Sequence, residues 1–329
     1  MELDTLNTPS DVWDSANFVV EHAHDVTIDD AGLKALAEPV RQRFLKGFDN
    51  VEDAFGSTDD LDKDINLVYF ETAANFCFWA QDDKDKWKFE HNSQSSGGWY
   101  GLRNAFAKAL DDGVPIYDPQ FMSELTLSQA ANIFRGQDNI QIPLLEWRVN
   151  NIVDAANFLL RKHEGSAHLF LKACDFDAPT IAREITHALT SYRDGAWYEG
   201  KWIWILKRAQ ILPNDLSQLT QKYPDFAIKN THKLTVFADY RLPQILEHYG
   251  VLQYSQSLSQ KIIGKQLLPS GSTEEVEIRA ATIAACKNLS ELLPDMTIAD
   301  IDVSLWLISQ DMRSDPSLKP HHLTVSYFY

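Results

Sequence analysis

The spacing of apolar residues along this chain predicts a protein built mainly from helices. Through most of the sequence, apolar side chains recur at the period of one helix face. Helices are predicted to start at Ser10 and at Thr27 or Asp29, and to cover 65–79, 99–112, 126–135, 144–163, 166–174, 179–192, 207–212, 244–249, 274–293 and 297–308. Pro39 is expected to break or kink the second helix, and Pro143 to stand in the first turn of 144–163.

Three stretches depart from the helical period. Residues 197–205 are aromatic and β-branched about a Glu199-Gly200 pair, which predicts a small β-hairpin. Residues 49–64 and 81–98 are polar, so we expect exposed loops there, and a loop as long as the second is often a lid or binding loop. The predicted fold class is mainly α: a single compact helical domain over 1–329 with a small β-hairpin, in which 10–60 is a candidate subdomain.

The charge balance and the apolar content narrow the classes to which this protein can belong. The chain has 329 residues, of which 44% are hydrophobic and 11% aromatic, enough for a large core and for a site built from stacked rings. Lys and Arg number 30 against 47 Asp and Glu, giving a net charge of −17. Such a charge opposes binding to nucleic acid, which depends on neutralising phosphates. No run of eighteen apolar residues is present, so no membrane span is expected.

The cysteines and the first residues indicate an intracellular protein. Cys77, Cys174 and Cys286 show no paired spacing, which is typical of reduced, mostly buried thiols. The opening residues, MELDTLNTPSD, are acidic and polar and lack the features of a signal or transit peptide. We therefore expect a cytoplasmic protein with no membrane partner.

The stretch 234–244, LTVFADYRLPQ, joins an apolar run to two opposite charges. Asp239 ends the run, and Tyr240, Arg241 and Pro243 follow closely. A carboxylate placed directly after an apolar run is expected to be partly removed from water, where it can act as a nucleophile, a base or a stabiliser of positive charge. The alternative is the end of a helix or strand at which Asp239 and Arg241 form a surface ion pair.

Four motifs in a fixed order give the chain a resemblance to a known family. They are NFCFW at 75–79, KRAQIL at 207–212, FADYR at 237–241 and EVEIRAATI at 275–283. With these motifs at these separations, the chain resembles the queuosine salvage protein family, the queuosine 5'-phosphate N-glycosylases/hydrolases, from about Trp13 to the tail. The resemblance implies an all-helical fold like that of DNA glycosylases. It also implies an enzyme that releases queuine from queuosine 5'-monophosphate and leaves ribose 5-phosphate.

The resemblance assigns the catalytic carboxylate to Asp239, the Asp of FADYR. Cleavage of an N-glycosidic bond builds positive charge on the ribose, so a carboxylate beneath the anomeric carbon would stabilise that charge or bond to the carbon. Water then completes the hydrolysis, so neither a metal nor a cofactor is expected. In one departure from the family pattern, Leu206 stands before KRAQ where an aromatic residue is expected, so Trp202 or Trp204 would have to supply that contact.

Residues in and after NFCFW are candidates for holding the base. Phe76 and Trp79 are three apart and would share one face of a regular helix, whereas Phe78 would point elsewhere. A base stacked on such rings gains about 1–3 kcal/mol. Asn75 and Asp82 are candidates for the polar edge of the base or its cyclopentenediol. The alternative is that all three aromatic side chains belong to the core.

The 5'-phosphate of the implied substrate requires a cation or helix-terminal amides. Lys207 and Arg208 lie side by side at a predicted helix start, and Lys207 is our candidate for the phosphate. The alternative for Arg208 is a structural ion pair with Asp215 or a similar carboxylate. Arg241 is a candidate contact that could instead orient a carboxylate.

Further acidic residues could bind the amine of the implied ligand, which should be cationic near neutral pH. Glu199, at the predicted hairpin turn, is such a candidate. Glu275, Glu277 and Arg279 in EVEIRAATI are instead expected to form a helix face with internal ion pairs.

The last ten residues, PHHLTVSYFY, are more apolar than a free chain end usually is. We expect this tail to dock in an extended form, because leaving it free would invite aggregation. Strand-like alternation would turn Leu323, Val325 and Tyr327 inward and leave Thr324 and Ser326 outward.

Histidines are candidates for ligand or metal contacts. Docking of the tail could bring His321 or His322 to the phosphate or sugar; the alternative is a structural strap with both histidines facing water. His22 and His24 are two apart, a poor spacing for metal ligands on a helix, and no HExxH motif accompanies them, so no metal site is expected. The candidate substrate-binding residues are therefore Asn75, Phe76, Trp79, Asp82, Glu199, Lys207, Tyr240, Arg241 and His322.

Two other functions compete with hydrolysis of a nucleotide. A helical module that binds a modified base without cleaving it would use the same stacking and phosphate residues, but it would not need Asp239. A repair enzyme acting on duplexes is disfavoured by the net charge of −17 and by the lack of a basic stripe. The expected partner is a free nucleotide, not intact tRNA or DNA.

Overall fold

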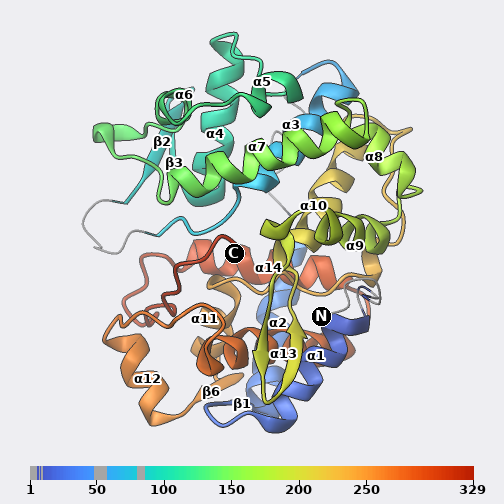
Figure 1. The fold of residues 1–329 in the computed structure, drawn as a ribbon. Coiled ribbons are helices and arrows are strands. Elements are labelled where there is room, and N and C mark those ends of the chain that lie inside the picture. Colours follow the sequence, from blue (N-terminus) through green and yellow to red (C-terminus); the bar gives the residue numbers. More distant parts are fainter. Residues whose placement is uncertain (1–5, 7, 9, 48–57, 80–85) are drawn as a thin grey trace. The chain divides into compact units, whose positions relative to one another are not determined.

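The structure is a computed structural model that describes residues 6, 8, 10–47, 58–79 and 86–329 (Figure 1). Within these residues, fourteen α-helices are accompanied by three two-stranded antiparallel sheets. The predicted class, mainly α with a small hairpin, is confirmed, while the likeness to DNA glycosylases remains an expectation. The single domain over 1–329 and the subdomain over 10–60 also remain predictions.

The chain divides into two compact units, which are described one at a time. Unit 1 comprises Met1–Asp49, Tyr192–Gln210 and Asn230–Tyr329, and unit 2 comprises Asn50–Ser191 and Ile211–Lys229. The helix α10 (Lys207–Ser217) begins in unit 1 and ends in unit 2.

Unit 1 is organised around one long buried helix, α13 (Thr273–Leu292), which carries the EVEIRAATI motif. Every residue from 275 to 286 is buried, as expected of a helix that is covered on all sides. Its neighbours include α1, α2, α11 and α14. The other elements of unit 1 are α1 (Ser10–His22), β1 (Val26–Ile28), α2 (Asp30–Leu45), β4 (Gly195–Tyr198), β5 (Lys201–Trp204), α11 (Arg241–His248), β6 (Leu252–Tyr254), α12 (Gln256–Ile263) and α14 (Ile298–Asp311).

The predicted β-hairpin of unit 1 is present as β4 and β5. Tyr198 pairs with Lys201 across a two-residue turn in which Glu199 and Gly200 have φ of 45° and 77°. Two positive φ values in a row are typical of the turns that match the twist of a hairpin. The remaining pair in unit 1, β1 with β6, joins two distant segments antiparallel.

Unit 2 is organised around α3 (Leu61–Ala74), which is buried continuously from residue 64 to its end. The helices α4, α7 and α8 pack against it. The buried helix that the apolar run predicted is therefore confirmed, although NFCFW follows the helix instead of ending it. The other elements of unit 2 are β2 (Lys88–His91), β3 (Gln94–Gly97), α4 (Gly98–Asp111), α5 (Pro119–Ser123), α6 (Leu127–Ile133), α7 (Leu145–Lys162), α8 (Ala167–Ala173) and α9 (Ala178–Ala188).

Both prolines that were used to place helices behave differently from prediction. The helix α2 continues through Pro39 to Leu45, so the predicted break is wrong. Its buried Leu36 and Val40 lie on either side of the proline, and such packing outweighs one missing N–H. Pro143 lies outside α7, because Leu144 has a left-handed φ of 53° and the helix starts at Leu145.

The predicted loop over 81–98 is wrong for residues 88–97, which form the hairpin β2–β3. Phe89 is buried while Lys88 and Glu90 are exposed, the alternation of a strand with one covered face. Asn92 and Ser93 make the turn with positive φ values of 48° and 63°. In the predicted loop over 49–64, α3 already begins at Leu61, and residues 49–57 lie outside the described residues.

The tail of the chain docks in unit 1, as predicted, but with the opposite face inward. Leu268 donates its N–H to the carbonyl of Leu323 at 2.8 Å, which ties the tail to the segment before α13. Thr324 and Ser326 are buried, whereas Leu323 and its alternate neighbours are half-buried. The predicted orientation is wrong because the tail is anchored by other side chains, the buried His322 and Tyr329.

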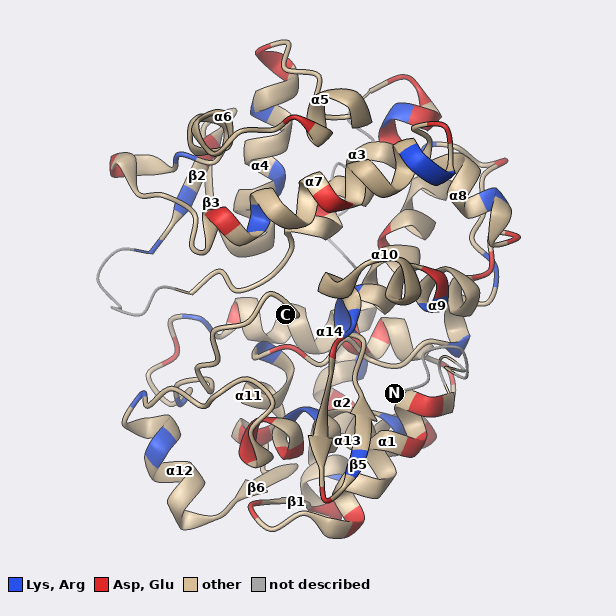
Figure 2. Ribbon diagram, in the orientation of Figure 1, with Lys and Arg blue, Asp and Glu red and all other residues tan. Residues whose placement is uncertain are grey.

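Three further features bear on the class of protein. The three cysteines are buried and unpaired, which confirms the expectation of free thiols. None of the described helices combines the length and the apolar character needed to cross a membrane. Acidic and basic residues are interspersed along the elements of each unit (Figure 2).

Candidate active site

Asp239 stands at the start of α11 in unit 1, where the helix fixes one of its oxygens. Its Oδ1 accepts the backbone N–H of Arg241 at 2.7 Å and of Leu242 at 3.1 Å. These are amides that a helix start leaves without an intrahelical partner. Asp239 is half-buried, and within the described part of the chain no hydrogen bond to its Oδ2 is present. Oδ1 thus holds the carboxylate in place, and Oδ2 is available for another partner.

Side chains from three helices hold the extended segment that leads to Asp239. Asp302 of α14 accepts the N–H of Phe237 at 2.7 Å. Gln210 of α10 accepts the N–H of Thr235 at 2.9 Å. Arg279 of α13 donates Nε–H to the carbonyl of Ala238 at 3.0 Å. A segment without its own ladder of hydrogen bonds is in this way fully anchored next to the candidate carboxylate.

Tyr240 and Arg241 take positions around the start of α11 and not against the carboxylate of Asp239. The Arg241 guanidinium donates to Gln244 at 3.1 Å and lies 5.5 Å from the Tyr240 ring. The surface ion pair between Asp239 and Arg241 that the sequence left open is not among the interactions of the described residues. Tyr240 is buried, and its ring packs 4.5 Å from that of His321 in the tail.

The helix α10 begins at Lys207, as predicted, and Lys207 is buried there. Its backbone N–H donates to Oδ2 of Asp194 at 2.9 Å. The preceding Leu206 has a left-handed φ of 56°, and its N–H donates to the Asp194 carbonyl at 3.1 Å. The turn that presents Lys207 is thus built on Asp194, a residue that sequence patterns did not single out.

Arg208, beside Lys207, has a structural role within unit 1. It is fully buried, donates to the carbonyl of Tyr327 at 2.7 Å, and lies 4.5 Å over the ring of Tyr192. Burial lowers the pKa of Arg208, although the tyrosines and Asp194 act in the opposite direction. This residue therefore fastens the tail to α10.

The tail histidines do not both face water, so this part of the strap alternative is wrong. His322 is buried and its Nε2 lies 3.3 Å from the hydroxyl of Tyr329. Burial, with the nearby His321 and Arg279, lowers the pKa of His322 well below its ordinary range. At neutral pH His322 is therefore an uncharged ring.

Glu199 lies at the turn of the β4–β5 hairpin and is exposed. Asp194 and Lys207 lie near the open end of the hairpin, and this turn closes the opposite end. The adjacent Tyr198 donates to the carbonyl of His22 at 3.0 Å or to Glu277 at 2.9 Å. Glu199 thus lies at the opposite end of the hairpin from the start of α10.

Unit 2 holds the NFCFW residues in an irregular segment after α3. Cys77 has a φ of 36°, so the segment is not regular and the expected opposition of Phe76 and Phe78 fails. The buried Arg148 of α7 lies 4.3 Å over the Phe76 ring and 5.1 Å over the Phe78 ring, and it donates to the Phe76 carbonyl. Phe76 is thus a core ring, whereas Trp79 is half-buried.

Asn75 ends α3, and its side chain is mostly buried. Its backbone N–H donates to the Thr72 carbonyl at 3.2 Å, while no hydrogen bond of its amide group occurs within the described residues. Such an amide can bind the edge of a heterocycle. The further candidate Asp82 lies outside the described residues.

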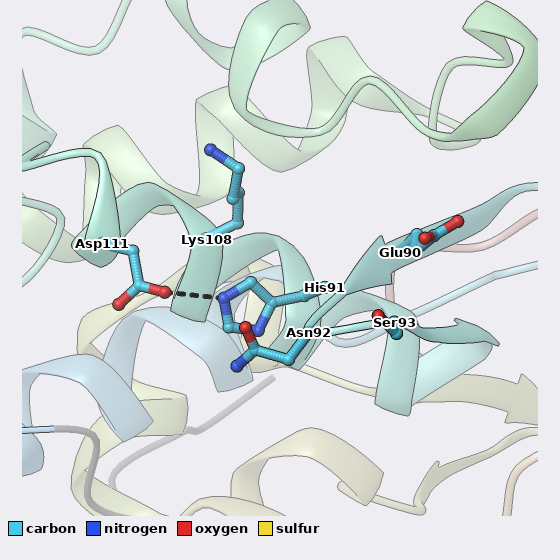
Figure 3. Close-up of a pocket in the computed structure, with 6 residues that line it drawn as sticks. All are labelled: Glu90, His91, Asn92, Ser93, Lys108 and Asp111. Atoms are coloured by element: carbon cyan, nitrogen blue, oxygen red, sulfur yellow. Dashed lines mark hydrogen bonds and ion pairs between the residues drawn. The ribbon is translucent and has the colours of Figure 1, made fainter.

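A separate hollow of about 410 Å³ opens on unit 2 beside the β2–β3 hairpin (Figure 3). His91 and Asp111 lie next to each other in its lining, with 2.7 Å between Nε2 and Oδ2. The rest of the lining is Glu90, Asn92, Ser93 and Lys108. None of the candidate site residues that the structure describes is part of this lining.

Among the residues that the structure describes, no group of three or more His, Cys, Asp or Glu side chains is placed to hold a metal ion. His22 binds the carbonyl of Phe18 through Nδ1 at 2.8 Å, and the backbone N–H of His24 donates to Glu277 at 3.0 Å. The ring of His22 therefore has a structural partner, and the backbone of His24 is fixed by Glu277.

A helical protein with a half-buried carboxylate at a helix start, one oxygen held by amides, suits the class of enzymes that stabilise positive charge on a substrate. Comparison with known proteins gives the family. The chain belongs to the queuosine salvage protein family, whose family model matches residues 56–329. That match includes all four motifs.

Relatives from distant organisms cover nearly the whole chain. A queuosine 5'-phosphate N-glycosylase/hydrolase of Sphaerobacter thermophilus is 32% identical, over 94% of this chain and 95% of its own length. The enzymes of the same name from Bos taurus and Mus musculus are each 30% identical, over 99% and 98% of this chain and 100% of their own lengths. The family expected from the motifs is thereby confirmed.

Proposed function

We propose that this protein hydrolyses the N-glycosidic bond of queuosine 5'-monophosphate, releasing queuine and ribose 5-phosphate. Family membership and the shared name of the full-length relatives support the proposal. The observation within this chain that carries it is the geometry of Asp239, with Oδ1 held by two helix amides and Oδ2 left for another partner. A protein that only bound the base would not need this carboxylate.

In the proposed reaction Asp239 stabilises the sugar as the bond to the base breaks. The electron pair of the C–N bond leaves with queuine, which takes up a proton, and positive charge develops on the ribose. A carboxylate beneath the anomeric carbon favours that state electrostatically or bonds to the carbon. Water then adds its hydroxyl to the carbon and releases a proton. The amides of Arg241 and Leu242 keep the carboxylate aimed throughout.

For the rest of the substrate, we assign roles by chemistry. Lys207 is proposed for the 5'-phosphate, because a buried ammonium at a helix start binds an oxyanion strongly. Trp79, half-buried, is a better stacking candidate than Phe76, which Arg148 covers. The other proposed contacts remain Asn75, Asp82, Glu199, Tyr240, Arg241 and His322.

Neither a metal nor a cofactor has a part in the proposed reaction, because water can add to an oxocarbenium-like sugar without a Lewis acid. The substrate would be a free nucleotide, and the proposed location is the cytoplasm, where reduced thiols are normal.

The test is to incubate the protein with queuosine 5'-monophosphate and to follow queuine and ribose 5-phosphate by mass spectrometry. Equal rates with and without a chelator are expected. Asp239→Asn keeps an oxygen for the two helix amides, so it should still fold and bind, while kcat falls about 10²–10³-fold or more.

The matched control is Asp302→Asn, because Asp302 also accepts a backbone N–H of the same segment. It should retain most of the activity of the folded protein. Tight binding of the nucleotide without any release of queuine would identify a binding module. Near-normal turnover by Asp239→Asn would remove Asp239 from the catalytic role.

A further inference from the structure

One buried guanidinium in unit 1 binds the segment that carries Asp239 directly and the backbone of Lys207 through Asp194. Arg279 of α13 donates Nε–H to the carbonyl of Ala238, one peptide before Asp239, at 3.0 Å. Its two terminal nitrogens bind the two oxygens of Asp194 at 2.8 and 2.7 Å. Asp194 in turn accepts the backbone N–H of Lys207 at 2.9 Å. Four hydrogen bonds thus connect the residue before Asp239 to the backbone of Lys207.

We propose that Arg279 is a positioning residue, which fixes the carboxylate of Asp239 at a set place relative to Lys207. The inference rests on the proposed function, since it gives the two residues their parts in one reaction. Arg279 would not touch the substrate. It would act by holding the Ala238 carbonyl on one side and, through Asp194, the first turn of α10 on the other.

Only an arginine can make this set of contacts. The guanidinium is planar and presents five N–H groups in a fixed fork, so one edge can hold a carboxylate while Nε–H points to a carbonyl. A lysine ammonium has no such geometry and could satisfy Asp194 or Ala238 but would not orient both. The third partner, Glu275, lies 3.3 Å from Nη1 one turn earlier on the same helix.

The residues around Arg279 keep its guanidinium charged and restrict its movement. Burial by itself would lower the pKa of Arg279, but the carboxylates of Asp194 and Glu275 outweigh it and raise that pKa. Burial raises the pKa of Glu275, which moves this carboxyl toward its neutral form. The ring of Tyr329 covers the guanidinium at 3.9 Å. A buried, paired and covered guanidinium has little freedom to move, which is what positioning requires.

The consequence is a separation between stability and catalysis that can be measured. A residue that only stabilises the fold changes the fraction of folded protein, not the rate per folded molecule. A positioning residue also changes that rate, because a displacement of about 1 Å at the reacting groups costs about 100-fold.

The variant to measure is Arg279→Lys, with Glu277→Gln as its matched control. Glu277 is equally buried on the same helix, but its carboxylate binds the N–H groups of His24 and Asp25, away from the FADYR segment. Both variants should melt at lower temperature than the parent protein. Per folded molecule, Arg279→Lys should lose about 100-fold in kcat, and Glu277→Gln less than about threefold.

Amide hydrogen exchange tests the same inference without substrate. In Arg279→Lys, the amides of Lys207 and Arg241 should exchange at least about tenfold faster, while amides of the remote α12 should not change beyond the overall loss of stability. If Arg279→Lys is too unstable, Asp194→Asn, which keeps the shape but loses the charge, is measured in the same two ways.

The outcomes separate this inference from the proposed function. If the parent protein releases no queuine, the proposed function fails, and hydrogen exchange still decides whether Arg279 orders the two segments. If the parent protein is active and Arg279→Lys retains kcat and slow exchange at Lys207 and Arg241, the positioning role is overturned.

Discussion

At the scale of single residues, the buried Lys207 offers the sharpest test of how the phosphate is recognised. Lys207→Ala removes a charge-assisted contact worth about 1.5–3 kcal/mol, so kcat/KM for the 5'-monophosphate should fall about tenfold to a hundredfold. The loss on the bare nucleoside, which has no phosphate, should be much smaller. Steady-state kinetics on both substrates measure the difference.

Lys201→Ala is the control for this change, because Lys201 is an exposed lysine of β5, which precedes α10, and its ammonium lies over the ring of Phe18. Lys201→Ala should leave kcat/KM unchanged for both the nucleotide and the nucleoside. Equal losses on nucleotide and nucleoside in Lys207→Ala would exclude Lys207 from the phosphate role.

The buried His322 should make the protein sensitive to mild acid. Its pKa in the folded state is well below the ordinary value of 6.5, first because of burial and then because of His321 and Arg279. Below about pH 6.5 the unfolded chain therefore binds a proton that the folded chain does not. The contribution of His322 to stability is present above that pH and is lost as the pH falls, with a slope of at most about 1.4 kcal/mol per pH unit.

His322→Gln should accordingly flatten the decline of stability between pH 7.5 and 5, as measured by urea denaturation at each pH. The free energy of unfolding at pH 7.5 should fall because the packing with Tyr329 changes. The exposed His232 provides the control, His232→Gln, which should keep the pH profile of the parent protein. If the free energy of unfolding of His322→Gln falls with pH as steeply as that of the parent protein, other groups cause the acid sensitivity.

At the scale of elements, the sequence predicted helices well where a cap lies next to an apolar face. The helices predicted over 126–135 and 297–308 begin at Leu127 and Ile298, directly after Thr126 and Thr297, which both form capping boxes in the structure. The Glu199-Gly200 turn likewise placed the β4–β5 hairpin. These signals are local: each Thr accepts the backbone N–H three residues ahead, and the hairpin turn depends on the positive φ values of two adjacent residues.

Elements set by distant packing could not be predicted in this way. The turn of β2–β3 uses Asn92 and Ser93, without the glycine that usually marks such a turn. Leu144 adopts a left-handed conformation that its sequence would disfavour, and the nearby Arg148 binds the carbonyl of Pro143 at 2.6 Å. Arg148 also donates to the carbonyl of Phe76, so a tertiary contact holds this helix start and overrides the preference of the proline.

The tail is an element whose docking was predicted and whose importance can be measured. A variant ending at Leu318 loses the buried Tyr329 and His322, and removal of one large buried aromatic side chain alone costs about 3–5 kcal/mol. The melting temperature should fall by at least about 5 °C. Tyr329→Phe, which keeps a ring over Arg279, is the matched control and should lose much less. An unchanged melting temperature for the shortened chain would show that the tail contributes nothing.

At the scale of the whole molecule, motifs gave the candidate residues but not the network that holds them. Asp239 and Lys207 could be named from FADYR and KRAQIL, since each motif is contiguous. Asp194 could not, because it lies 85 positions from Arg279 and carries no pattern of its own. The one available signal was Arg279 itself, since a charged residue within an apolar helix calls for a buried acidic partner.

Net charge is the remaining property of the whole chain, and it predicts the form in which the substrate is used. The net charge of −17 opposes binding to the phosphates of tRNA, and basic residues are scattered among acidic ones along the described elements (Figure 2). Intact tRNA containing queuosine should therefore yield no queuine, even at low salt. The same tRNA digested to 5'-mononucleotides should yield queuine at the rate of the free nucleotide. Release from intact tRNA, weakening as salt rises, would contradict the prediction and point to direct action on the nucleic acid.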